Sequence, residues 1–319
     1  MTLCFYHPAC EQHDPGVAHS ENKKRLTVVM DALKAKNLPN LRFIEMQTGS
    51  RETIELVHTK DYIDFVFASV PKEGYQDIEV NEIVSDHDDG EVTTLSPESG
   101  EALLRCAGAA VMAVDAVMKG TDTKAFCATR PPGHHALTNK AMGFCVFNNA
   151  AIAARYAQKT YGIGKVVFVD FDVHHGNGTH QIFENDPSIC AISIHQLPLW
   201  PESGFAHETG CGNILNVPMA PDTSREDWLR AWKEKILPRI EEERPELIII
   251  NAGFDAHKDE SKSAQNLETE DYMTLTRDLV ALANKHANGR LISFLEGGYN
   301  LKALAESVTA HVTALGETR

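Results

Sequence analysis

Eight short apolar segments alternate with longer amphipathic stretches, and this alternation limits the possible folds more than any other feature of the chain. Short apolar runs are typical of parallel strands buried on both faces, and the stretches between them are typical of crossover helices. The pattern predicts an α/β fold with a single doubly wound, mostly parallel eight-stranded sheet and helices on both faces. No internal repeat, low-complexity tract or linker interrupts it, so we expect residues 1–319 to form one domain. The predicted strands cover residues 3–6, 41–46, 125–129, 166–169, 189–195, 214–217, 247–250 and 291–295.

Helical periodicity lies between these strands, and a long acidic segment without clear periodicity covers residues 71–97. A loop of this length in a compact domain is often functional. Its acidic run ends at Glu91, which either belongs to a solvated face or contacts substrate. Ser20 is expected to cap a helix that reaches about residue 33. Further helices are predicted over residues 53–58, 62–70, 97–119, 147–161, 227–243, 269–286 and from about 300 to 315.

Charge and composition exclude several classes of partner. The net charge of −15 leaves no basic block for a nucleic acid, and the hydrophobic fraction of 43% is ordinary for a globular protein. No run reaches membrane-spanning length, and the N-terminus lacks the pattern of a signal peptide. The seven cysteines have no CxxC spacing, as expected for reduced thiols. We therefore expect a cytoplasmic protein without nucleic-acid or membrane partners, and leave open whether it forms a homo-oligomer.

The strongest chemical signal follows the predicted strand at residues 166–169, where Asp170, Asp172, His174 and His175 occur close together. Side chains two positions apart on a strand share a face, so the first three would point the same way. Two carboxylates and an imidazole would repel and desolvate one another unless a cation lay among them. The alternative is that they cap the next helix or pair with a buried lysine or arginine. The pattern predicts a metal site, provided that another segment supplies a further ligand.

Other reactive side chains also follow predicted strands. Asp255 is a candidate third ligand, although an isolated aspartate there could equally cap a helix. His134 and His135 follow two prolines and a glycine, and are either a hydrogen-bonded pair in the core or acid/base groups. Tyr299 follows two glycines, and considered alone it would more often be a core residue. Because the carboxyl ends of parallel strands share one edge of the sheet, we expect these residues to meet there.

Five segments together resemble the zinc-dependent histone deacetylases and their bacterial deacetylase-like and acetylpolyamine amidohydrolase relatives, in particular the class II-like branch. The resemblance extends from about residue 5 to about residue 310. It implies the arginase–deacetylase fold and one catalytic Zn²⁺ held by Asp172, His174 and Asp255, a ligand set that also suits Fe²⁺. It further implies K⁺ near the zinc, bound by Asp170, Asp172, His174, Ser193 and Ile194. The matching segments are Arg130-Pro-Pro-Gly-His-His-Ala136, Gly143-Phe-Cys-Val-Phe-Asn-Asn149, Asp170-Phe-Asp-Val-His-His-Gly-Asn-Gly178, Ala252-Gly-Phe-Asp255 and Glu296-Gly-Gly-Tyr299.

The same resemblance implies roles in amide hydrolysis. His135, and secondarily His134, would relay a proton from metal-activated water to the leaving amine, while Tyr299 would polarise the carbonyl. Asp170 would orient His134, and Asn177 would face His135. An asparagine at this position leaves the pKa of the histidine lower than an aspartate would, which favours a neutral base.

The substrate implied by the resemblance is acetyl-lysine or another acylated primary amine that enters a narrow apolar tunnel. Phe144 and Trp200 would form opposite walls, and Gly143 would face the ligand because no Cβ fits. Lys262 lies where relatives carry a residue at the rim, and an acidic residue is found in that neighbourhood in polyamine-selective relatives. We therefore expect a deacylase of this kind, with an acetylpolyamine amidohydrolase as the alternative. A silent binding protein and a two-manganese ureohydrolase agree less well with the filled catalytic positions.

Overall fold

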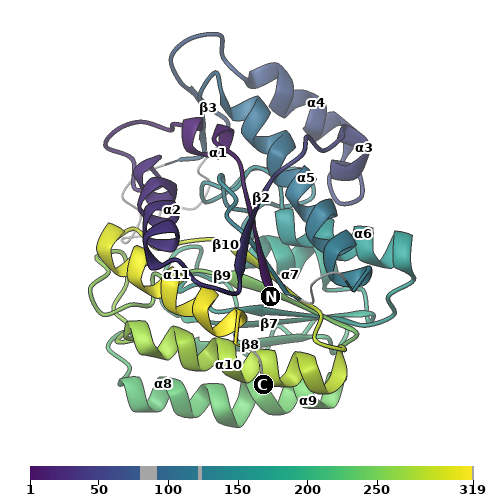
Figure 1. The fold of residues 1–319 in the computed structure, drawn as a ribbon, viewed down its shortest axis with the longest axis vertical. Coiled ribbons are helices and arrows are strands. Elements are labelled where there is room, and N and C mark those ends of the chain that lie inside the picture. Colours follow the sequence, from purple (N-terminus) through teal and green to yellow (C-terminus); the bar gives the residue numbers. More distant parts are fainter. Residues whose placement is uncertain (80–91, 121–123, 318–319) are drawn as a thin grey trace.

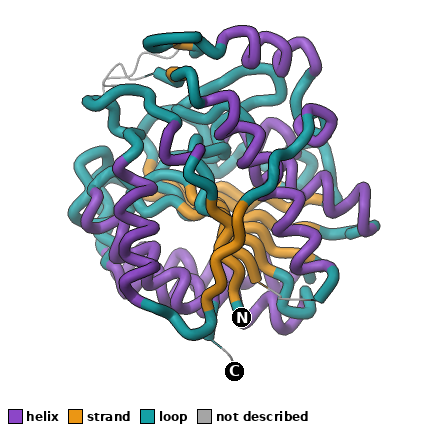
Figure 2. Tube along the Cα trace, turned by 45° about the horizontal axis from the view of Figure 1, so that its top comes forward, coloured by secondary structure: helices purple, strands orange, loops and turns teal. Residues whose placement is uncertain are grey.

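A sheet of eight strands, each parallel to its neighbours, runs through the middle of the molecule (Figures 1 and 2). The computed structural model describes residues 1–79, 92–120 and 124–317. The strand order is β2-β1-β5-β10-β9-β6-β7-β8, so the predicted sheet is confirmed and is parallel throughout. The strands are β1 (Thr2–Tyr6), β2 (Leu41–Glu45), β5 (Lys124–Cys127), β6 (Val166–Asp170), β7 (Ile189–Gln196), β8 (Ile214–Met219), β9 (Leu247–Ala252) and β10 (Leu291–Leu295).

Helices cover both faces of this sheet. The pair α5 and α6 packs on one face, and α10 and α11, with α2 beside α11, pack on the other (Figure 1). Among the described residues, no helix combines the length and the apolar character needed to cross a bilayer. The helices are α1 (Ala9–Gln12), α2 (Lys24–Lys36), α3 (Arg51–Ile54), α4 (Lys60–Ser69), α5 (Ser99–Met118), α6 (Asn149–Tyr161), α7 (Asn177–Phe183), α8 (Arg225–Ala231), α9 (Leu237–Glu243), α10 (Thr269–His286) and α11 (Leu301–Leu315).

The central strands are apolar because both of their faces are covered, and every residue of β6, β7, β9 and β10 is buried. Their register aligns the carboxyl ends: Asp170 of β6 pairs with Ser193 of β7 and with Asn251 of β9. On the other side of β9, Ala252 pairs with Leu295 of β10. The segments that follow β6, β9 and β10 therefore leave the sheet side by side, and the site is built from them.

Three local expectations need correction. Ser20 does not cap α2, which begins at Lys24; the Asn22 side chain accepts the backbone N–H of Lys24 instead. The helix predicted over 227–243 is divided by a π-helical turn (Trp232–Ile236), next to Pro238, which has no N–H to donate to the preceding turn. The acidic segment also contributes a pair of short antiparallel strands that lacked a sequence signal. It consists of β3 (Gln76–Asp77) and β4 (Thr94–Leu95).

Candidate functional site

Asp172, His174 and Asp255 form a compact cluster at the carboxyl edge of the sheet. The Nδ1 atom of His174 lies 3.0 Å from Asp172 Oδ1 and 3.1 Å from Asp255 Oδ2. Both carboxylates are fully buried, and the imidazole is half-buried. One ligand atom from each residue lies within 4.8 Å of the others. The structure therefore brings together the three residues expected to bind a metal, although they come from two segments that are distant in the sequence.

The backbone around this cluster donates hydrogen bonds to the two carboxylates, and two glycines leave space for them. A Cβ atom at Gly253 would lie 2.0 Å from Asp172 Oδ2, and one at Gly297 would lie 2.3 Å from Asp255 Oδ2. The N–H of Gly297 donates to Asp172 Oδ2 and that of Val173 donates to Asp255 Oδ1, each at 2.8 Å. Only glycine therefore fits at positions 253 and 297 without moving a carboxylate.

The charges of the cluster suit a divalent cation. Burial lowers the pKa of His174, but hydrogen bonds to Asp172 and Asp255 outweigh it and raise this pKa to about 10. Burial, with the charge of Asp172 adding to it, raises the pKa of Asp255 to about 6. The two carboxylates thus hold a proton on the imidazole between them. A divalent ion supplies more positive charge than that proton, and two carboxylates with one imidazole are a donor set that Zn²⁺ and Fe²⁺ accept.

His134 and His135 lie against one another beside the cluster, with ring centroids 3.8 Å apart. The Nδ1 atom of His134 is 3.0 Å from Asp170 Oδ2, and the Nδ1 atom of His135 is 2.7 Å from Asn177 Oδ1. His134 Nε2 lies 3.7 Å from Asp172 Oδ2. Each histidine is therefore held through Nδ1 by the partner expected from the sequence, and Nε2 remains for other contacts.

The two histidines are in opposite electrostatic environments. Burial lowers the pKa of His134, but the charges of Asp170 and Asp172 outweigh it and raise this pKa to about 10. Burial, together with the positive charges of His134 and His174, holds the pKa of His135 well below its usual range. At neutral pH His134 is the charged partner and His135 the neutral one. Two titratable groups whose environments separate their pKa values are a common basis for acid/base chemistry.

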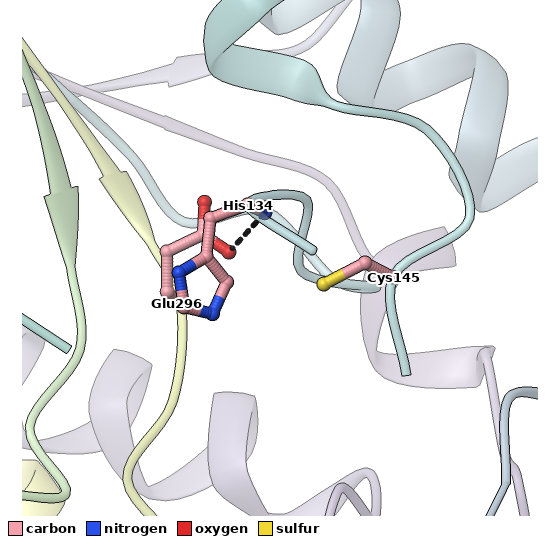
Figure 3. A group of neighbouring side chains, drawn as sticks. All are labelled: His134, Cys145 and Glu296. Atoms are coloured by element: carbon pink, nitrogen blue, oxygen red, sulfur yellow. Dashed lines mark hydrogen bonds between the residues drawn. The ribbon is translucent and has the colours of Figure 1, made fainter. Parts of the chain in front are cut away.

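Glu296 is a site residue that the sequence reasoning did not single out. Its Oε2 atom accepts the backbone N–H groups of Gly133 at 2.7 Å and His134 at 3.1 Å. Figure 3 shows it beside His134 and the thiol of Cys145, three residues from separate segments. Burial raises the pKa of Glu296 to about 7 and holds that of the Cys145 thiol well above its usual value. Through these two hydrogen bonds, Glu296 holds the loop that carries His134 next to the end of β10. A charged residue directly after an apolar strand was the signal that could have identified it.

Tyr299 lies half-buried above the end of β10. Its ring centroid is 6.0 Å from that of Phe144, and the guanidinium carbon of Arg25 is 5.0 Å from the Tyr299 ring. The backbone N–H of Tyr299 donates to Glu260 Oε2 at 2.6 Å, which holds the backbone in place just before α11. Burial holds the pKa of the phenol well above its usual value, against the opposing charge of Arg25. Tyr299 therefore remains a hydrogen-bond donor at neutral pH.

A tight turn carries Gly143 and Phe144. Met142 and Cys145 exchange two backbone hydrogen bonds of 3.1 and 3.0 Å, and the residues between them have φ angles of 55° and 68°. A bulky side chain at positive φ is strained. The N–H of Phe144 donates to Thr93 Oγ1 at 2.9 Å, and this bond helps to hold the turn.

The glycine at position 143 is required by two neighbouring side chains. A Cβ atom there would lie 2.4 Å from Cη2 of Trp200 and 2.6 Å from Cδ2 of His135. Gly143 therefore makes room for these two side chains, and its place beside a ligand stays a prediction. The Trp200 ring packs edge-on at 4.8 Å from His135 and 6.3 Å from His174. Trp200 thus lies against the histidines, whereas Phe144 lies toward Tyr299.

The remaining expected residues are less closely tied to the cluster. Glu91 lies outside the described residues. Lys262 lies half-buried in the loop after Asp255, and this loop is fastened by the Ser263 hydroxyl, which donates to the Asp255 carbonyl at 2.5 Å. From the expected K⁺ set, Ser193 pairs with Asp170 on the neighbouring strand. Its hydroxyl lies 2.8 Å from Nδ1 of His195.

A parallel α/β sheet that gathers a carboxylate–imidazole cluster and a histidine pair at its carboxyl edge has the layout of a hydrolytic enzyme. Residues 19–315 match the family model described as the histone deacetylase domain. The chain belongs to the histone deacetylase family. This membership makes it a hydrolase of the deacetylase class.

Individual relatives agree with this assignment. The chain is 36% identical to type-2 histone deacetylase 2 of Dictyostelium discoideum over 99% of its own length and 21% of the relative's. It is 34% identical to polyamine deacetylase HDAC10 of Mus musculus over 99% of its length and 46% of the relative's. It therefore spans less than half of these two proteins. The crystal structure of the HDA15 HD domain superposes with a TM-score of 0.87 at 30% identity, covering 98% of this chain and 90% of that one.

Proposed function

We propose that the chain is a zinc-dependent amidohydrolase that removes acetyl or related acyl groups from acylated lysine or a similar primary amine. The observation that carries this proposal is the buried cluster of Asp172, His174 and Asp255 beside a histidine pair held by Asp170 and Asn177. Family membership supplies the reaction class, and the side chains supply the acid/base groups. We take residues 1–319 as one catalytic domain.

Asp172, His174 and Asp255 would hold the ion. When bound, Zn²⁺ supplies Lewis-acid activation of water and of the amide carbonyl. The glycines at positions 253 and 297 support this assignment, because they leave room for both carboxylates, whose oxygens lie within 4.8 Å of the His174 nitrogen. The same donors suit Fe²⁺, so metal analysis of the purified protein has to decide between the two ions.

The other residues of the site would bind, orient and move protons. His135 is neutral and its Nδ1 is engaged by Asn177, which leaves Nε2 to accept a proton from the attacking water. His134, held by Asp170, would stabilise charge and serve as a second proton donor. Tyr299 stays protonated and would donate a hydrogen bond to the oxygen on which negative charge develops.

The family resemblance, with Phe144 and Trp200 expected to line a narrow tunnel, favours a slender acylated amine as substrate. A polyamine is the second candidate, because one relative is named a polyamine deacetylase and the chain has a net charge of −15. Lys262 argues against a polyamine substrate. A lysine at the expected rim of the tunnel would repel a cationic polyamine. In addition, we propose a structural K⁺ bound by Asp170, Asp172, His174, Ser193 and Ile194.

A substrate panel on the zinc-reconstituted enzyme tests the proposal. Peptides carrying acetyl-lysine, longer acyl-lysines and trifluoroacetyl-lysine are compared with acetylputrescine and acetylspermidine, with a hydroxamate inhibitor as a control. We expect hydrolysis of acyl-lysine that the hydroxamate abolishes. Exclusive turnover of the polyamines would replace the lysine assignment by the second candidate, and no turnover of any amide would reject both.

A further inference from the structure

Asn177 makes two side-chain contacts in opposite directions. Its Oδ1 atom lies 2.7 Å from Nδ1 of His135, and its Nδ2 atom donates to Sδ of Met142 at 3.2 Å. Met142 is buried beside the site. A thioether sulfur carries lone pairs and no hydrogen, so it can only accept. Met142 therefore requires the NH₂ end of Asn177, and the carbonyl oxygen is left to face the histidine.

The orientation of Asn177 decides where the proton of His135 lies. A carbonyl oxygen cannot donate, so the Nδ1 atom that faces it must carry the hydrogen. A neutral imidazole has one N–H, and its Nε2 is then free to accept a proton. With the amide reversed, its NH₂ group would face Nδ1 and favour the tautomer protonated on Nε2. That tautomer cannot act as a base through Nε2.

Met142 is held firmly enough for this purpose. It forms one side of the tight turn closed by its two backbone hydrogen bonds to Cys145. The N–H of Gly143 donates to the carboxylate of Glu79 at 3.1 Å, which ties the turn to a second segment. Asn177 begins α7, and its backbone N–H donates to the His175 carbonyl at 2.8 Å. The sulfur and the amide thus come from two separately anchored backbones.

We propose that Met142 is a positioning residue that sets the tautomer of His135 through the amide of Asn177. The proposal rests on the proposed function, because it matters only if His135 is the base. It predicts that the effect of Met142 depends on which residue occupies position 177. A carboxylate there has two equivalent acceptor oxygens and no NH₂ group, so it needs no partner to orient it. Met142 should therefore matter only while residue 177 is asparagine.

The tautomer can be measured directly in the zinc-loaded protein labelled with ¹⁵N-histidine. Long-range ¹H–¹⁵N correlation spectra distinguish a protonated from an unprotonated ring nitrogen, and His135→Ala assigns the resonances. We expect the wild-type His135 to be protonated on Nδ1 at pH 8. We expect Met142→Leu, which keeps the volume but removes the acceptor, to show a substantial population protonated on Nε2. A wild-type His135 protonated on Nε2, or an unchanged tautomer in Met142→Leu, would overturn the proposal.

Kinetics in two backgrounds provide a second, independent readout. Met142→Leu should lower kcat by about fivefold, the effect of one hydrogen bond, with little change in KM. In the Asn177→Asp background the same substitution should change kcat by less than about twofold. An equal loss in both backgrounds would mean that Met142 only packs, and would reject the proposal.

Met112→Leu is the matched control, because Met112 Sδ also accepts an N–H, from the Gln47 backbone at 3.1 Å, and lies on α5 outside the site. We expect it to change neither the tautomer nor kcat. If the wild type hydrolyses no acylated amine, the proposed function fails. The spectra would still show whether Met142 controls the tautomer, so the two failures are distinguishable.

Discussion

Two buried polar clusters lie side by side at the carboxyl edge of the sheet, and they balance their charges in opposite ways. The carboxylate cluster consists of Asp172, His174 and Asp255. The arginine cluster consists of Glu21, Arg25 and Arg130, all with fully buried side chains. The segment after β10 joins them: the Gly297 N–H bonds to Asp172, and the carbonyls of Glu296 and Gly298 accept from Arg25 at 2.5 and 2.6 Å.

The arginine cluster is complete as it stands. Glu21 accepts from Arg130 at 2.5 and 2.8 Å and from Arg25 at 2.9 Å. Burial raises the pKa of Glu21, but the charge of Arg130, followed by that of Arg25, outweighs it and brings this pKa to about 2. Backbone carbonyls accept further N–H groups of both arginines, and the carbonyl of Cys10 lies 2.8 Å from Nη1 of Arg130. Every charge here has a permanent partner within the chain.

The carboxylate cluster is balanced by an exchangeable proton instead of by a guanidinium group. Asp172 and Asp255 accept backbone N–H groups and share the imidazole of His174, whose proton a bound cation can replace. Neighbouring carboxylates can thus be neutralised either by guanidinium groups or by a removable cation. Burial of acidic groups therefore does not by itself indicate a metal site. The groups that neutralise the buried carboxylates have to be identified as well.

The largest effect is expected from Asp255→Asn, which removes one of the two anionic ligands. It should abolish most Zn²⁺ binding and lower kcat/KM by about a thousandfold or more, because several kcal/mol of charge stabilisation is lost. Metal content after dialysis and hydrolysis rates measure both effects. Asp259→Asn in the same loop is the control, since that side chain is exposed, and it should keep the metal and the rate. Full zinc occupancy in Asp255→Asn would contradict the assignment of this cluster.

The same change of carboxylate to amide in the arginine cluster should act on stability instead. Glu21→Gln leaves two buried guanidinium groups without a counter-charge, so we expect the free energy of unfolding to fall by about 3–5 kcal/mol. Denaturant unfolding of the metal-free proteins measures this. Asp255→Asn should destabilise the metal-free protein less, because Asp172 remains as a charged partner of the His174 imidazole. Equal destabilisation by the two substitutions would invalidate the comparison.

Glu101→Gln provides the scale for this measurement. Glu101 pairs with Arg105 on the surface of α5 at 2.7 Å, and its side chain is 47% exposed. Exposed pairs contribute about 0–1 kcal/mol, so this variant should unfold almost as the wild type does. Any larger loss in Glu21→Gln is then due to burial of the charges.

The next largest effect is expected from Tyr299→Phe, which removes a hydrogen-bond donor without changing the carboxylate cluster. We expect kcat to fall by about 10²–10³-fold with metal content unchanged, the usual effect of one lost donor to a developing oxyanion. Tyr272→Phe is a matched control, because the Tyr272 hydroxyl is buried and makes no hydrogen bond. It should leave kcat unchanged. An equal rate in Tyr299→Phe would contradict the role of this phenol as the donor to the developing oxyanion.

The sheet and the carboxylate cluster could be predicted because their signals are local. Apolar runs mark buried strands, and polar residues just past them must meet once the strands are parallel. The arginine cluster left no such signal, since Glu21 and Arg130 are 109 positions apart and each is ordinary in its own segment. Burial and pairing of these groups depend on tertiary contacts.

The same limit applies within the site. The side chains that exclude a Cβ at Gly143 are Trp200 and His135, and their approach follows from packing alone. The hydrogen bond from Asn177 to Met142 also joins side chains from separate segments, 35 positions apart. Sequence patterns thus predicted which residues meet at the sheet edge, but not how each is oriented there.

The smallest effect expected is a pH dependence in the metal-free protein. The pKa of Asp255 is raised from its usual 3.8 to about 6, so the folded state binds a proton more tightly than the unfolded state. Its contribution to stability is present below pH 3.8 and is lost as the pH rises through about 6. Between pH 4 and 6 the free energy of unfolding should therefore fall by on the order of 2 kcal/mol. The contribution of Glu21 to the free energy of unfolding has the opposite pH dependence. Because its pKa is lowered, this contribution is present above pH 4.5 and is lost only as the pH falls toward 2.

The measurement is the difference between wild type and Asp255→Asn across pH 4 to 6.5, because all other titrating groups contribute nearly equally to both proteins. We expect the wild-type curve to fall relative to the variant as the pH rises. Saturating Zn²⁺ should reverse this difference, since an ion that displaces protons binds more tightly at higher pH and stabilises only the protein that holds it. Parallel curves without metal would mean that the carboxylate cluster is already neutralised within the chain, as the arginine cluster is. The contrast between the two clusters would then be lost.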